Sequence, residues 1–176
     1  MKIPLMLVMM SACLISQTRA SDENVPEKNL AALGLTLPAS PSVVANYVPA
    51  VRSGNLVFLA GQVARSADGK IIAGRVGQDF TEAQGADAAR TCALQLLAVL
   101  KAEIGDLARV KRIVRVGGFV NCTPDFTAQP KVVNGASDLF VAVFGDRGRH
   151  ARASVGVAAL PAGAPVEIEL VAEVTD

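Results

Sequence analysis

The 176-residue chain contains no tryptophan, one tyrosine, one histidine and three cysteines, and aromatic residues make up only 4% of it. A disulfide scaffold needs more cysteines, and a Cys/His metal centre needs more than one histidine or a C-x-x-C pair. Charge of one sign is not in excess either, because 17 basic and 16 acidic residues give a net charge of +1. Nucleic-acid binding needs a positive field and often stacking aromatics. We therefore expect no metal site and no nucleic-acid partner.

Familiar catalytic signatures are also missing. The sequence has no G-x-S-x-G, Walker, H-E-x-x-H or dinucleotide-binding motif. What it does have is a hydrophobic fraction of 51% in a chain of ordinary domain length. This combination predicts one globular domain with a substantial core.

The first 20 residues have the pattern of a secretory signal peptide. Lys2 precedes an apolar run over 3–15, and Ala20 precedes an acidic stretch. The run is shorter than the roughly 20 apolar residues that span a bilayer. We therefore expect a signal peptide at 1–20, a mature domain at 21–176, a periplasmic or secreted location and no stable membrane association after signal removal. Lipid attachment at Cys13 and a buried N-terminal helix are the alternatives.

Periodicity and turn residues predict an α+β domain. Helices are expected at 24–34, 81–103 and 130–144, and strands at 47–51, 56–63, 70–73, 110–121, 151–159 and 166–174. Thr81 and Gln84 have the spacing of a capping box, and Pro130 suits a helix start. Gly117 and Gly118, inside a strand, indicate a bulge or a close approach of another backbone. The order predicts a single mixed sheet with two helices packed on one face.

The other face of this sheet is expected to need a partner. It carries glutamates from the last strand together with small and apolar residues such as Val171. A half-apolar open face is usually covered by another copy of the same chain. The residues therefore predict a homo-oligomer.

Few side chains are candidates for chemistry. Arg152 begins a strand of small residues, where its charge needs either a carboxylate ligand or an intersubunit salt bridge. Asn134 flanks the apolar stripe of its helix, and Tyr47 is either a lid or a rim residue. His150 is either a structural histidine or a general base. Cys92 and Cys122 are either core residues or a disulfide pair, which the sequence alone does not decide.

These residues lie within segments that resemble the RidA/YjgF family of enamine and imine deaminases, also labelled endoribonuclease L-PSP. The segments are NYVPAV at 46–51, GNLVFLAGQ at 54–62, GFVN at 118–121, AR at 151–152, LP at 160–161 and VEIE at 166–169. Further segments, LAALG at 30–34, PDF at 124–126 and NGASD at 134–138, resemble a divergent subgroup of that family. The likeness covers roughly residues 24–174.

The resemblance implies a chorismate-mutase-like homotrimer with ligand sites between subunits. Arg152 matches the family's arginine for the substrate carboxylate, and Glu167 matches the acid that positions the hydrolytic water. Tyr47, Gly61 and Asn134 match pocket residues. Two positions differ from the archetype: Ala60 replaces a serine, and Ser154, which we also include among the substrate-binding candidates, replaces a cysteine.

The function implied by the resemblance is hydrolytic deamination of 2-iminoacids to 2-oxoacids and ammonia, without a metal or organic cofactor. The alternative is a non-catalytic trimer that binds small carboxylates or protects proteins. RNA cleavage rests on the family label alone, and the charge balance argues against it.

The sequence does not decide whether Arg152 and Glu167 share one pocket. If the strands of Arg152 and Glu167 formed a simple hairpin, the two would lie ~23 Å apart, so joint action would require another strand order or a neighbouring subunit.

Overall fold

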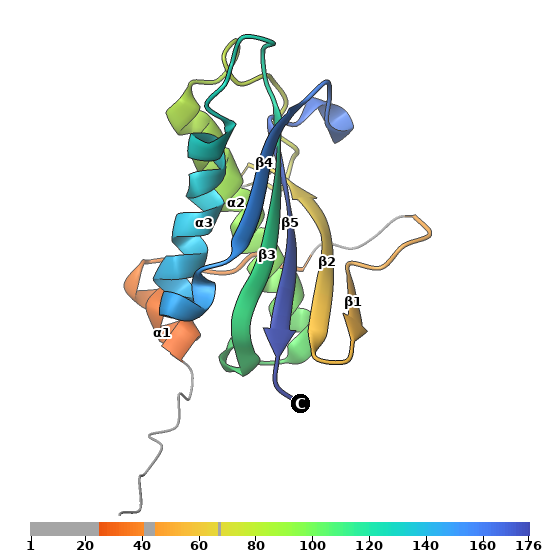
Figure 1. The fold of residues 1–176 in the computed structure, drawn as a ribbon, viewed down its shortest axis with the longest axis vertical. Helices are drawn as coiled ribbons and strands as arrows, with labels where there is room; N and C mark the ends of the chain where they lie inside the picture. The colour runs from red at the N-terminus through yellow and green to blue at the C-terminus, as the bar shows by residue number, and fades with distance from the viewer. Residues whose placement is uncertain (1–24, 41–44, 67) are drawn as a thin grey trace, which may run out of the picture.

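Five strands form one mixed sheet in the order β1-β2-β5-β3-β4 in the computed structural model, which describes residues 25–40, 45–66 and 68–176 (Figure 1). The signal peptide predicted at 1–20, including Cys13, lies outside these residues. The strands are β1 (Ala50–Ser53), β2 (Leu56–Val63), β3 (Val110–Asn121), β4 (Ala151–Val157) and β5 (Val166–Val174). The helices are α1 (Val25–Ala32), α2 (Glu82–Ile104) and α3 (Gln129–Phe144), with short 3-10 turns at Leu107–Arg109, Gly145–Gly148 and Pro161–Gly163.

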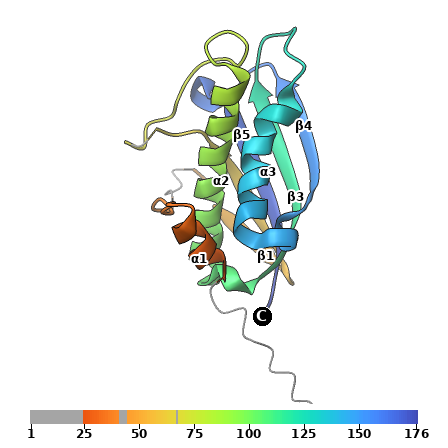
Figure 2. The ribbon, with the colours of Figure 1, turned by 90° about the vertical axis from the view of Figure 1, so that its left-hand side faces the viewer.

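The helices all lie on one side of the sheet (Figure 2). Helices α2 and α3 pack against the sheet and against each other, and α1 packs against α3. The predicted arrangement of a single mixed sheet with two helices on one face is thus confirmed, with α1 as a third helix outside them. Leu30 of α1 is buried, whereas Leu33, which follows the end of the helix, is exposed.

Helix α2 begins and ends where its local sequence predicts. The Thr81 hydroxyl accepts from the Gln84 amide N–H, and the Gln84 side chain accepts from the Thr81 N–H, which completes the capping box. The helix ends at Ile104, and the N–H of Gly105, which has a φ of 83°, donates to the Lys101 carbonyl. Between these ends, residues such as Leu96, Leu97 and Leu100 are fully buried.

Helix α3 approaches both α2 and β3 closely at glycines. A Cβ on Gly118 would overlap the Val133 side chain, and a Cβ on Gly135 would overlap the Ala86 backbone. At Gly117 and Gly118 the nearest atoms belong to the side chains of Glu169 and Val133, so the close approach of another backbone expected there is not present. No bulge occurs at Gly117 or Gly118, because β3 shifts register earlier, between 110 and 112 and between 113 and 115.

Three strand predictions are wrong in detail, the smallest difference being that β4, expected over 151–159, ends at Val157. Residues 70–73 form no strand and make only an isolated bridge between Arg65 and Ile71. The reason is that both edges of β2 are already occupied, by β1 and by β5. The first strand starts at Ala50 rather than Tyr47, since Pro49 has no N–H to donate and only its carbonyl pairs, with Ala60 N–H.

The uncovered face of the sheet carries a row of apolar side chains. Val51 pairs with Phe58, and Phe58 pairs with Val171 across three neighbouring strands. Phe58 is 46% exposed and Val51 53% exposed, whereas the alternate β5 residues facing the helices are fully buried. None of the described helices is long and apolar enough to span a membrane.

Candidate functional site

Arg152 lies on β4, the strand at one edge of the sheet, and reaches across to helix α3. Its Nη1 donates to Asn134 Oδ1 at 2.8 Å and to Ser137 Oγ at 3.0 Å. Asn134 and Ser137 are three residues apart and therefore lie on the same face of α3. Among the described residues no carboxylate pairs with Arg152, so its charge is available to an anion.

Ser154 lies two residues after Arg152 on the same side of β4. Its hydroxyl oxygen is the only buried side-chain polar atom without a hydrogen-bond partner in the part of the chain that the structure describes. A buried, unpaired hydroxyl costs free energy, so such a group in a native structure requires an explanation. Here the unpaired Ser154 hydroxyl lies near Arg152, so the polar groups beside Arg152 are not all hydrogen-bonded within the chain.

Glu167 lies on β5, on the uncovered face of the sheet. It alternates with Val166 and Ile168, which are fully buried toward the helices. Burial, and secondarily the charge of Glu169, raises the pKa of the half-buried Glu167 carboxyl above its ordinary value. Its side chain lies over Gly61, where a Cβ would overlap the Glu167 carboxylate. Glycine at 61 is therefore what lets this carboxylate lie flat against β2.

The neighbouring Glu169 has the same arrangement but a different partner. Its side chain lies over Gly117, and its carboxylate pairs with Arg115 at 2.7 Å. Glu167 has no ion pair or hydrogen bond of its side chain among the described residues. Glu167 thus combines a raised pKa with a side chain that has no partner among the described residues, which suits an acid or base in a reaction.

Arg152 and Glu167 do not meet within one chain. Strands β4 and β5 do not form a hairpin but flank β3, where Arg152 is opposite Val116 and Glu167 is opposite Phe119. This places them about 10 Å apart along β3 and two strand spacings of about 4.8 Å apart across the sheet. Arg152 faces the helices, whereas Glu167 faces the open side. The strand order therefore shortens the separation expected for a hairpin but leaves the two groups on opposite faces.

Three of the other four predicted site residues lie beside Arg152 or Glu167, and the fourth, Tyr47, lies at a sheet edge. Asn134 and Ser154 accompany Arg152, and Gly61 accompanies Glu167. Tyr47 is 60% exposed and precedes β1, at the sheet edge opposite to β4. A single chain therefore presents two half-sites rather than one assembled pocket.

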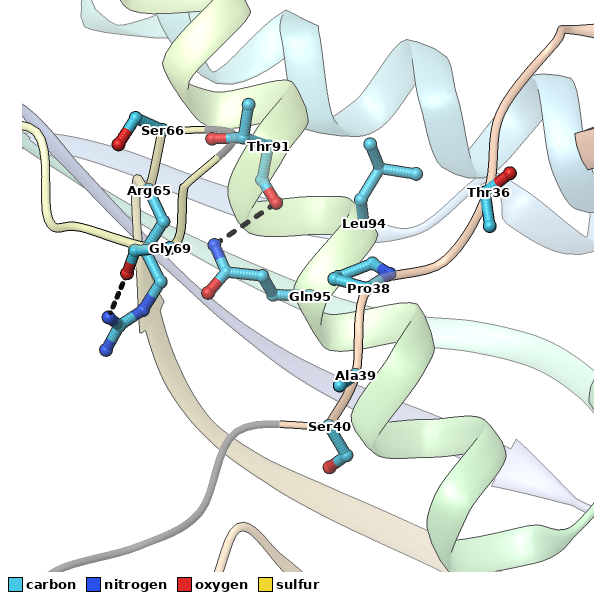
Figure 3. Close-up of a pocket in the computed structure, with 10 residues that line it drawn as sticks. All are labelled: Thr36, Pro38, Ala39, Ser40, Arg65, Ser66, Gly69, Thr91, Leu94 and Gln95. Carbon is cyan, nitrogen blue, oxygen red and sulfur yellow. Dashed lines mark hydrogen bonds between the residues drawn. The ribbon is translucent and has the colours of Figure 1, made fainter.

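The most voluminous of the cavities found lies elsewhere (Figure 3). It measures about 650 Å³ and is lined by α2, by residues 36–40 and by Arg65, Ser66 and Gly69, with none of the predicted site residues among them. Its polar side chains bond to nearby backbone: Arg65 to the Gly69 carbonyl, and Gln95 to the carbonyls of Val63 and Thr91. Because none of the predicted site residues line this cavity, we do not take it as the candidate site.

Other residues that could take part in chemistry, the cysteines and several basic residues, instead make contacts within the fold. Cys92 and Cys122 are free thiols, and burial raises the pKa of Cys92 far above its ordinary range. Several basic residues outside the candidate site are engaged: Lys111 and Arg115 pair with glutamates of β5, Arg149 pairs with Asp146, and Arg147 donates to the Val110 carbonyl. In the described ranges, no group of three or more potential ligands could hold a metal ion.

Comparison with known proteins decides the family. The profile described as "YjgF/chorismate_mutase-like, putative endoribonuclease" matches residues 27–174. The chain belongs to the YjgF family. Its fold is accordingly the YjgF/chorismate-mutase-like fold, and the match covers every strand described above.

Individual YjgF-family relatives differ in what their names state. Protein TCP17 of Trypanosoma cruzi is 46% identical over 84% of this chain and 93% of its own length. The 2-iminobutanoate/2-iminopropanoate deaminase of Dermatophagoides farinae is 29% identical over 77% of this chain and 91% of its own. The crystal structure of Atu1372 from Agrobacterium tumefaciens, a protein of unknown function, is 42% identical with a TM-score of 0.81, over 88% of this chain and 95% of that one. The YjgF family thus includes a relative named as an imine deaminase.

Two residues beside Arg152 in this YjgF-family chain, Ser137 and His150, have contacts that their sequence positions did not predict. Ser137 was not singled out as a site residue, and the role of His150 was left between a structural histidine and a base. In the structure Ser137 Oγ lies 3.0 Å from His150 Nε2. The spacing of Ser137 from Asn134, one helical turn on the same face, is the signal that could have indicated it.

Proposed function

We propose that the protein hydrolyses 2-iminoacids to 2-oxoacids and ammonia, at sites formed between subunits of a homotrimer. Water adds to the carbon of the C=N bond, the nitrogen takes up protons, and the C–N bond then breaks as the new C=O bond forms. The reaction is redox-neutral and uses only water besides the substrate. The observation that carries this proposal is Arg152, held by α3 through Nη1 alone and thus open to a carboxylate.

Arg152 would bind the substrate carboxylate. A guanidinium offers two parallel N–H groups that match the two oxygens of a carboxylate, and this fixes the orientation of the imine carbon. Orientation is a large part of what such a reaction needs, because holding reactants in place replaces the entropy cost of a bimolecular encounter. Asn134 and Ser154 would line the same half of the site.

Glu167 would orient and deprotonate the attacking water. A general base works best when its pKa lies near the working pH, and burial raises the pKa of Glu167 in that direction. Gly61 supports this role by leaving room for the carboxylate over β2.

The opposite orientations of Arg152 and Glu167 support a site built from two chains. The row of Val51, Phe58 and Val171 on the uncovered face gives a second copy an apolar surface to cover. A homotrimer is the assembly that the family resemblance implies. In it, each site would combine Arg152 of one subunit with the glutamate half of another.

A direct test measures the release of 2-oxoacids from 2-iminoacids that an amino-acid oxidase generates in the same reaction mixture. We expect the protein to accelerate release and Arg152→Ala to abolish the acceleration. Arg149→Ala, a change at a nearby exposed arginine paired with Asp146, serves as the matched control and should retain activity. Because Ala60 and Ser154 depart from the archetype, binding without turnover is the competing result. It would make the protein a non-catalytic carboxylate-binding module.

A further inference from the structure

The contacts around Arg152 continue into a chain of hydrogen bonds that has a defined direction. His150 Nδ1 lies 2.7 Å from the Gly148 carbonyl, and His150 Nε2 lies 3.0 Å from Ser137 Oγ. A carbonyl oxygen can only accept, so Nδ1 carries the hydrogen. In the neutral ring Nε2 is then an acceptor, and the Ser137 hydroxyl donates to it. The lone pairs of Ser137 are thereby left for Arg152.

The His150 end of this hydrogen-bonded chain is fixed by packing. A Cβ on Gly148 would overlap the Phe140 carbonyl, so only glycine allows the turn that aims its carbonyl at His150. Arg147, in the same turn, donates to the Val110 carbonyl of the sheet. The His150 ring stands edge-on to Phe140, with ring centroids 5.9 Å apart. The half-buried His150 ring is therefore held in place by the turn at 145–148 and by Phe140.

These contacts leave one edge of the Arg152 guanidinium free. Nη1 has two hydrogens, and Asn134 and Ser137 use both of them. Nε and Nη2 have no partner among the described residues. Together they form the edge of the guanidinium that can bind both oxygens of one carboxylate side by side.

We propose that Ser137 and His150 are positioning residues that hold Arg152 by Nη1, so that its Nε and Nη2 edge faces a single carboxylate. This inference rests on the proposed function, since it assigns the means by which Arg152 binds its ligand. His150 acts through Ser137 by accepting the hydroxyl hydrogen. Neither residue touches the substrate.

The test uses pyruvate as the carboxylate probe, with its Kd measured by calorimetry, beside KM and kcat for the imine reaction. We expect Ser137→Ala to raise the Kd for pyruvate and the KM about tenfold while kcat changes little, because Arg152 binds substrate and transition state alike. Ser137→Thr, which keeps the hydroxyl, should restore binding. His150→Phe, which keeps the ring against Phe140 but lacks the acceptor, should weaken binding, and His150→Gln, which supplies an acceptor, should restore part of it.

Asp138→Ala, a change at an exposed neighbour on α3, is the control and should bind pyruvate like the wild type. If the wild type binds pyruvate and Arg152→Lys does not, yet Ser137→Ala and His150→Phe bind normally, the inference fails while the proposed function stands. If the wild type neither binds pyruvate nor deaminates iminoacids, the proposed function fails and the inference fails with it. A uniform loss of folding in all Ser137 and His150 variants, the Ser137→Thr and His150→Gln variants included, would assign them a purely structural role.

Discussion

At the scale of single residues, two of the three glutamates of β5 show how neighbouring carboxylates acquire different chemistry. Glu167 and Glu169 lie on the same face, each over a glycine of an adjacent strand. Arg115 neutralises Glu169, whereas Glu167 has no such partner and its pKa is raised by burial. The sequence pattern alone makes the two equivalent, and the difference comes from the arginine that β3 places beside only one of them.

Adding a methyl group at Gly61 should therefore reduce activity more than adding one at Gly117. The Cβ of Gly61→Ala would overlap the Glu167 carboxylate and displace it. A displacement of about 1 Å at a catalytic group can lower kcat by roughly 100-fold. Gly117→Ala displaces Glu169 instead and should retain most of the activity. Steady-state kinetics of both variants provides the measurement, and equal losses would contradict the role of Glu167.

His150 gives the stability of the protein a pH dependence of predictable sign. Burial lowers the pKa of His150 below its ordinary value of 6.5; the Gly148 carbonyl opposes this shift and the charge of Arg152 adds to it. Below about pH 6.5 the unfolded chain thus binds more protons than the folded one. The free energy of unfolding should fall as the pH falls through this range, and level off below the folded-state pKa.

Because His150 is the only histidine, one variant isolates this effect. Urea unfolding of wild type and His150→Gln between pH 5 and 8 should show a difference in unfolding free energy that shifts in favour of the wild type as the pH rises. Comparing the two proteins removes the contribution of Glu167, whose raised pKa acts in the opposite direction at lower pH. A difference that is constant with pH would contradict the lowered pKa of His150.

At the scale of secondary-structure elements, α2 depends on its N-terminal cap. The Thr81 hydroxyl accepts the otherwise unpaired N–H of Gln84. Thr81→Ala should lower the free energy of unfolding by about 1 kcal/mol, and thus the Tm by roughly 2–4 °C. Thr127→Ala is a suitable control, because Thr127 is exposed and makes no side-chain hydrogen bond in the described structure. Equal melting temperatures for wild type and Thr81→Ala would contradict the capping role.

The elements that the sequence predicted well are those determined by residues close together in the chain. The capping box before α2, the buried stripe of α3 and the strict alternation of β5 are properties of neighbouring residues. The strand expected at 70–73 failed because β5, nearly a hundred residues later, occupies the edge of β2 that it would need. The contact of Ser137 with His150 was missed for a similar reason, since it depends on how the turn at 145–148 returns the chain to α3.

At the scale of the whole molecule, the two half-sites face away from each other. Arg152 bonds to α3 on the covered side of the sheet, and Glu167 lies on the uncovered side, where Val51, Phe58 and Val171 are also presented. Within one chain Arg152 and Glu167 point to opposite sides of the sheet, so a site that uses both is expected to draw on two subunits. The sheet therefore supplies each group to a different neighbour if the assembly is symmetric.

This arrangement predicts that two inactive variants restore activity when they assemble together. Arg152→Ala retains the glutamate half-site, and Glu167→Gln retains the arginine half-site. In a random equimolar mixture, about one quarter of the sites would pair an intact Arg152 with an intact Glu167 from different subunits, so about a quarter of wild-type activity should return. The two variants are unfolded and refolded together, with native mass spectrometry to verify mixed assemblies, and each variant refolded alone is the control. Mixed assemblies that remain inactive would mean that Arg152 and Glu167 do not act in one site.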